Sequence, residues 1–177
     1  MHNPHRVSAM NNQSTTIFTQ PARPAAIREI PEESGPGRLE VNVIFTDPKS
    51  TMAALKTAGS LARDLGACIK VRAAIAVPYT LPIDKPQVSI DFIENLLCDL
   101  VSRANLDSFE PSVHLYECRD QIETLLQVLK PNSLVIISGR KHWWPTAERR
   151  MAKTLRSKGH RVVFVDRQRN AESDLPC

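Results

Sequence analysis

The stretch Leu134-Val135-Ile136-Ile137-Ser138-Gly139-Arg140 decides the fold class. Four consecutive large apolar residues precede a serine, a glycine and an arginine, so apolar and polar positions do not alternate along the run. A strand of this composition is typical of a parallel sheet that is covered on both faces. Pro131 ends the helical pattern before it. The stretch therefore predicts a buried strand in an α/β domain.

Short apolar runs and helical patterns alternate on both sides of this strand. Apolar residues spaced three and four apart predict the helices, and Gly66 and Gly159 end two of them, as glycines at helix C-termini do. The predicted strands are residues 41–45, 69–77, 113–116, 134–137 and 162–165, and the predicted helices are residues 52–65, 90–104, 122–129 and 147–155. Right-handed crossovers between five such strands give a doubly wound parallel sheet with helices on both faces.

Composition divides the chain into one domain and two ends. Residues 1–38 contain five prolines and few large apolar residues, so we expect a disordered N-terminal extension. Residues 39–167 form the predicted α/β domain, and residues 168–177 are expected to be a frayed C-terminal tail. No apolar run reaches the length of a membrane span, and the first residues lack the apolar stretch of a secretory signal. We therefore expect a cytoplasmic protein.

No motif for a known chemistry is present in the sequence. The four cysteines lie in separate segments without zinc spacing, so no metal site is expected. A nucleophile elbow, a Walker sequence and a dinucleotide fingerprint are also lacking, which favours a non-catalytic protein. His114 is interpreted as structural, and His160 stands at a helix end that favours a cation. A buried or idle Cys118 is favoured over a thiol whose pKa is lowered by the neighbouring Arg119.

Three strand ends resemble the universal stress protein family over residues 39–167. They are Thr46-Asp47, Ala76-Val77-Pro78, and residues 131–140, which are similar to the family's "aDLIVIGsrG" strand and turn. The resemblance implies a strand order of 3-2-1-4-5 and homodimers formed through the last strand. It also implies that Asp47 and the backbone of Val77 match positions that hold adenosine in nucleotide-binding members. Asp47 before Pro48 also fits a helix cap, the interpretation we favour.

The loop after the fourth predicted strand departs from the family's G-x2-G-x9-G-[ST] pattern. Gly139 fits the first glycine, but His142 stands at the second, and no Gly-Ser or Gly-Thr follows at the required distance. A backbone cradle for a triphosphate is therefore expected to be missing. Arg140 and Lys141 could still bind an anion through their side chains. The helix that begins near Thr146 offers an N-terminus that also favours an anion.

Basic residues and both tryptophans concentrate around this loop. Residues 138–161 carry eight basic residues and one acidic residue. We interpret the helix face with Arg149 and Lys153 as solvated, with a patch for an acidic partner, nucleic acid or anionic membrane as the alternative. Packing of Trp143 and Trp144 in the structure is favoured over an exposed ring that fills a partner's pocket. Residues 140–146 also resemble stress-protein-like domains that accompany membrane transporters.

The sequence thus predicts a non-catalytic stress-response or regulatory domain that acts through protein interaction and dimerisation and has lost ATP binding. The expected partners are a second copy of the chain and a protein such as a membrane transporter, and no nucleic acid is expected. The predicted interaction surface comprises Trp143, Trp144, Arg149 and Lys153. The alternative is a site for ATP, AMP or another phosphorylated small molecule between the first and fourth strands. Its residues would be Asp47, Val77, Gly139, Arg140, Lys141 and Thr146.

Overall fold

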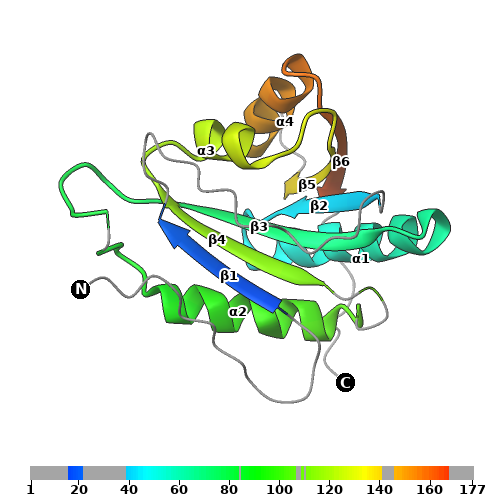
Figure 1. Ribbon diagram of the computed structural model, residues 1–177, viewed down its shortest axis with the longest axis horizontal. Helices are drawn as coiled ribbons and strands as arrows, with labels where there is room; N and C mark the ends of the chain where they lie inside the picture. The colour runs from blue at the N-terminus through cyan, green and yellow to red at the C-terminus, as the bar shows by residue number, and fades with distance from the viewer. Residues whose placement is uncertain are drawn as a thin grey trace, which may run out of the picture.

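The computed structural model describes residues 16–21, 39–83, 85–106, 109, 111–140 and 146–167, with residues 16–21 and Arg167 described by their backbone alone. Helices and strands alternate along almost all of this part of the chain (Figure 1). The elements are β1 (Thr16–Pro21), β2 (Glu40–Ile44), α1 (Pro48–Leu65), β3 (Cys68–Ala76), α2 (Ile90–Arg103), β4 (Ser112–Cys118), α3 (Gln121–Val128), β5 (Leu134–Arg140), α4 (Ala147–Ser157) and β6 (Arg161–Arg167).

The strands in the described part of the chain all belong to one parallel sheet. Its order is β1-β4-β3-β2-β5-β6. The five strands from β2 to β6 are the five that the sequence predicts, and they follow the predicted order 3-2-1-4-5. The doubly wound α/β fold is therefore confirmed, with β2 and β5 side by side at the point where the winding reverses.

The sheet contains one strand more than predicted. Thr16–Pro21 forms β1 and pairs in parallel with β4, from Thr16 opposite Ser112 to Pro21 opposite Glu117. The prediction of disorder was therefore wrong for these six residues, while the rest of residues 1–38 and residues 168–177 lie outside the described part of the chain. The run Thr16-Ile17-Phe18-Thr19 favours a strand, but the many prolines around it dominate the average composition. Pro21 is tolerated because it stands at the end of an edge strand.

Helices cover both faces of the sheet. α1 and α2 lie on one face, and α3 and α4 lie on the other, as Figure 1 shows. The larger core packs between the sheet and α1 and α2, where Val43, Leu55, Val71 and Leu97 are fully buried. A smaller core lies on the opposite face, beneath α3 and α4.

The prediction of continuously apolar strands holds for β5 but not for β3 and β4. Ile69, Val71 and Ala73 of β3 pack in the larger core, whereas the alternate residues Lys70 and Arg72 point to the opposite face. Both of these basic residues are nevertheless buried. The sheet therefore has a polar layer on one side of its central strands.

Candidate functional site

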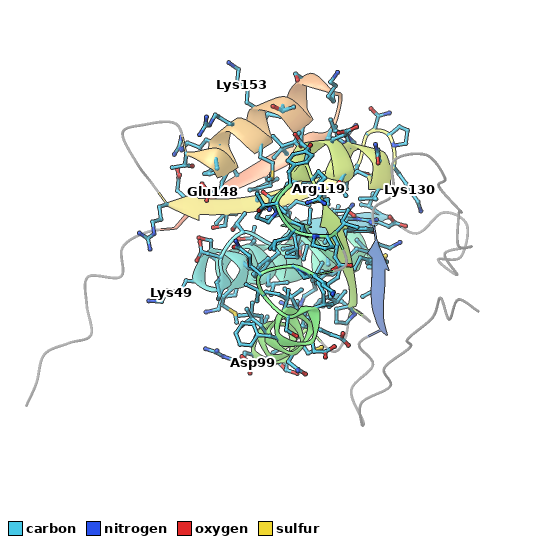
Figure 2. The ribbon with its side chains drawn as sticks, turned by 90° about the vertical axis from the view of Figure 1, so that its left-hand side faces the viewer. Lys49, Asp99, Arg119, Lys130, Glu148 and Lys153 are labelled. Carbon is cyan, nitrogen blue, oxygen red and sulfur yellow. The ribbon has the colours of Figure 1, made fainter. Side chains whose placement is uncertain are left out.

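The candidate site lies at the carboxyl ends of β2 and β5. β2 continues into α1 on one face of the sheet, and β5 leads to α4 on the other. A crevice at such a point is where ligands bind in open α/β sheets. Figure 2 labels Lys49 and Glu148, which lie in the first turns of these two helices and toward the same side of the view.

Asp47 caps helix α1. Its Oδ1 accepts hydrogen bonds from the backbone N–H groups of Lys49 and Ser50, each at 3.1 Å. Pro48 occupies the first helical position, where a missing N–H costs nothing. The favoured cap interpretation is therefore confirmed, and the carboxylate is turned toward amides of its own helix. Whether Asp47 also holds adenosine stays a prediction.

Thr46 links the ends of β2 and β5. Its Oγ1 donates a hydrogen bond to the carbonyl oxygen of Ser138 at 3.1 Å, and its N–H donates to Oγ1 of Thr51 at 3.2 Å. Near this link, the hydroxyl groups of Ser50 and Ser138 are fully buried without a hydrogen-bond partner. Burying a hydroxyl without a partner costs free energy. Two hydroxyl groups at the switch point are therefore able to form hydrogen bonds that the protein itself does not supply.

The side chain of Arg119 binds the backbone carbonyl groups that follow β3. Its Nη1 donates to the carbonyl oxygens of Val77, at 2.8 Å, and of Pro78, and its Nη2 donates to that of Leu81 at 2.9 Å. Its guanidinium also lies 5.1 Å from the ring centroid of Tyr79. The N–H of Val77 donates to the carbonyl oxygen of Cys118 at 2.8 Å. Both backbone groups of Val77 are thus engaged within the protein.

Gly139 is a packing position. A Cβ atom placed on it would lie 3.1 Å from Cβ of Glu148 and 3.1 Å from Cζ of Phe164. The space above this glycine is therefore filled by the first turn of α4 and by β6. The Glu148 side chain brings a carboxylate to the helix end that the sequence proposed for an anion.

The basic residues of this region are placed in different ways. Arg140 is exposed at the end of β5, and Lys153 is exposed on α4, pointing away from the sheet in Figure 2. Arg149 forms an ion pair with Asp166 at 2.7 Å, and its guanidinium stacks 5.0 Å from the ring centroid of Phe164. Thr146 caps α4 by accepting a bond from the N–H of Arg149 at 3.4 Å. Lys141, Trp143 and Trp144 lie outside the described residues.

The pKa values of Cys118 and His160 shift in directions opposite to those that the sequence suggested for a reactive thiol and for a cationic histidine. Burial raises the pKa of the Cys118 thiol, and Asp120 raises it further, while a hydrogen bond with Thr124 acts in the opposite direction. The alternative of a lowered thiol pKa was wrong, because Arg119 points to the loop carbonyls instead. Burial also lowers the pKa of His160, which disfavours the cation expected at that helix end.

The described part of the chain holds no cluster of three or more histidine, cysteine or acidic side chains suited to a metal ion. Among the same residues, no helix is both long enough and apolar enough to cross a membrane.

Similar proteins are found by comparison of three-dimensional structures and not by comparison of sequences. No family model and no curated protein matches the sequence. A universal stress protein from Archaeoglobus fulgidus is 17% identical, with a TM-score of 0.52 over 71% of this chain and 92% of that one. A universal stress protein in complex with cAMP is 15% identical, with a TM-score of 0.49 over 73% and 97% of the two chains.

The chain has the universal stress protein fold. At this identity the likeness establishes the fold alone, so the site of this universal-stress-protein-like domain must be judged from its own residues. The structure brings Asp47 and Gly139 to neighbouring strand ends and places Val77 one strand further away, after β3.

Sequence reasoning did not predict four residues that contact or line this site. Arg119, Ser50, Ser138 and Glu148 all lie at the carboxyl edge of the sheet. The position of Arg119 directly after the third predicted strand was the available signal, because that strand ends at the ligand-binding edge. Its bonds to carbonyl groups 38 to 42 residues earlier in the chain had no sequence signal.

Proposed function

We propose that this domain is a non-catalytic regulatory module that acts by binding a protein partner and a second copy of itself, without holding a nucleotide. The observation that carries the proposal is the engagement of Val77. Its N–H is bound to Cys118 and its carbonyl oxygen to Arg119. An adenine ring that used these groups would have to displace the Cys118 carbonyl oxygen from the Val77 N–H and compete with Arg119 for the Val77 carbonyl oxygen.

Displacement of Arg119 is costly. The guanidinium donates to three carbonyl groups and stacks on Tyr79. A hydrogen bond to a charged group contributes about 1.5–3 kcal/mol to stability. A nucleotide that displaced Arg119 would have to compensate for several such bonds before it gained affinity.

The region where a nucleotide would place its phosphates also disfavours binding. Glu148 packs over Gly139 through its Cβ and Cγ, so an acidic residue occupies the first turn of α4 beside the glycine at which the resemblance would place the phosphates. Like charges at short distance repel strongly in a partly buried site. Thr146 already caps the N-terminus of α4.

The edge strand β6 supports self-association. Val162, Val163, Phe164 and Val165 are all partly exposed on this edge of the sheet. An apolar edge strand readily pairs with another chain, and two copies joined through it would form a twofold interface. We further propose a cytoplasmic location and a protein partner, such as a membrane transporter, for the loop with Trp143.

A second candidate function is a site for an adenine nucleotide or another phosphorylated small molecule. The buried hydroxyl groups of Ser50 and Ser138 favour it, because each has hydrogen-bonding capacity at the carboxyl edge that a polar ligand could use. The exposed Arg140 at the end of the neighbouring strand could supply a bidentate contact to a phosphate.

Calorimetric titration of the full chain with ATP, ADP and AMP separates the two functions. The regulatory proposal expects no saturable heat from a folded sample. Saturable micromolar binding that weakens in Arg140→Ala would overturn it and establish the second candidate. Arg150→Ala is the matched control, because Arg150 is also an exposed arginine but lies on α4.

Sedimentation velocity tests self-association separately. We expect the mass of a dimer at micromolar protein concentration, falling to that of a monomer on dilution. A monomer mass throughout the accessible concentration range would contradict pairing through β6.

A further inference from the structure

Alternate residues of the edge strand β6 direct their backbone groups away from the sheet. The N–H of Arg161 donates to the carbonyl oxygen of Ser133, so Arg161 directs its own backbone groups toward β5. Because these groups alternate in direction along a strand, those of Val162, Phe164 and Asp166 point outward. An edge strand with outward N–H and C=O groups can pair with another strand.

Helix α4, which lies beside β6 in Figure 1, blocks one end of this edge. Arg156 donates from Nε, at 3.3 Å, and from Nη2, at 2.9 Å, to the carbonyl oxygen of Val162. The two bonds occupy both lone pairs of that oxygen. Among the described residues, no hydrogen bond reaches the outward backbone groups of Phe164 or Asp166. The edge is therefore closed at Val162 and open toward its carboxyl end.

Arg149 places a positive charge beside the open part of the edge. Its guanidinium lies 5.0 Å from the ring centroid of Phe164 and pairs with Asp166 at 2.7 Å. A guanidinium has five N–H donors, and the hydrogen bond to Asp166 uses only Nη2. The edge thus presents both an exposed carboxylate and a cation with further donors. A second copy of the same edge complements this charge pattern.

The blocked carbonyl group restricts how two copies of β6 can pair. Copies related by a twofold axis pair antiparallel, and each register places a different residue on the axis. With Phe164 on the axis, Val162 lies opposite Asp166, so the second copy needs the Val162 carbonyl oxygen. Val163 on the axis makes the same demand, and Asp166 on the axis sets two carboxylates directly opposite each other, which is destabilising. Of these four registers, the one with Val165 on the axis avoids both conflicts.

The side chains also match in the register with Val165 on the axis. Phe164 then lies opposite Asp166 of the second copy, and such cross-strand neighbours approach to about 5 Å. The carboxylate thereby comes beside the Arg149 guanidinium that stacks on the ring. The partly exposed Val165 meets its own copy in a non-hydrogen-bonded pair, in which side chains are closest.

We propose that two copies of the chain pair through β6 with Val165 on the twofold axis, and that Arg156 sets this register. Val162 then lies opposite a position beyond Arg167, the last residue of β6, so its carbonyl oxygen stays bonded to Arg156. This inference rests on the self-association proposed above and adds which residues meet. Arg156 is a positioning residue, because it acts by excluding the other registers.

Cysteine cross-linking measures the register. Non-hydrogen-bonded residues on antiparallel strands have Cα atoms about 4.5 Å apart, a distance that a disulfide spans. The two copies of Val163 would be about 14 Å apart, because Val163 lies opposite Arg167 instead. After oxidation with copper–phenanthroline, we expect about tenfold more disulfide-linked dimer from Val165→Cys than from Val163→Cys. Peptide mass spectrometry distinguishes this link from links of the native cysteines.

Removal of Arg156 tests its role. In Arg156→Ala the blocked carbonyl group becomes available, so the register with Phe164 on the axis, in which Val163 faces Val165, should gain population. A mixture of Val163→Cys and Val165→Cys chains reports that register, and its mixed disulfide should increase about fivefold. Arg150→Ala is the matched control, because it removes an exposed arginine of the same helix. An unchanged mixed disulfide in Arg156→Ala would refute the positioning role.

The outcomes separate this inference from the proposed function. A dimer in sedimentation velocity that links as well through Val163→Cys as through Val165→Cys would overturn the register and leave self-association intact. A dimer that forms neither link would place its interface away from β6 and would also overturn the register. A monomer would overturn self-association and the register together.

Discussion

Replacement of Asp47 by alanine removes the cap of α1. The carboxylate accepts two backbone N–H groups, each at 3.1 Å, and no other acidic residue stands in the first turn of the helix. Loss of such a cap costs about 1 kcal/mol. The loss of negative charge beside the positive end of the helix dipole adds about 0.5 kcal/mol. We therefore expect Asp47→Ala to lower the free energy of unfolding by about 1.5 kcal/mol.

Asp47→Ser separates capping from ligand binding. A serine hydroxyl can accept the same N–H groups, so this variant should recover about 1 kcal/mol of the loss. Urea unfolding followed by far-ultraviolet circular dichroism measures both variants. Asp120→Ala is a matched control, because Asp120 caps α3 through N–H bonds of 2.8 and 2.9 Å. Equal losses in Asp47→Ala and Asp47→Ser would refute the capping argument. Stabilisation by ATP that is present in the unmodified chain and absent in Asp47→Ser would show an adenosine contact.

Three further predictions follow from burial and close packing. Gly139→Ala should lower the free energy of unfolding by about 1 kcal/mol, because its Cβ meets Glu148 and Phe164 at 3.1 Å; an unchanged urea midpoint would show that α4 moves freely. Burial lowers the pKa of His160 below 6.5, so the unfolded chain binds more protons just below that pH. Stability should therefore be complete above pH 6.5 and fall as the pH drops through the folded pKa, and the fall should be smaller in His160→Gln; equal slopes would contradict this. Burial raises the pKa of Cys118, so iodoacetamide at pH 8 should modify this thiol only after unfolding in urea, and rapid modification of the folded chain would disprove its burial.

Local patterns predicted much of the domain correctly. The apolar run at Leu134 specifies a strand, and Asp47 with Pro48 specifies the start of α1. Gly66, which has a φ of 61°, ends that helix in the left-handed conformation that glycine adopts most easily. Each of these signals acts within a few residues, so the sequence alone carries it.

The sequence by itself therefore determined the order of the elements and their caps, while tertiary structure decided the state of the candidate site. β1 exists because β4 offers it an edge, although prolines surround it. Arg119 engages Val77 from 42 residues away, and Glu148 fills the space over Gly139 only because α4 folds back on β5. Lys70 and Arg72 are buried, although the sequence predicted only that they belong to a strand over residues 69–77. These contacts join segments that are distant along the chain, and their energies depend on packing and hydrogen-bond geometry that a linear pattern does not encode.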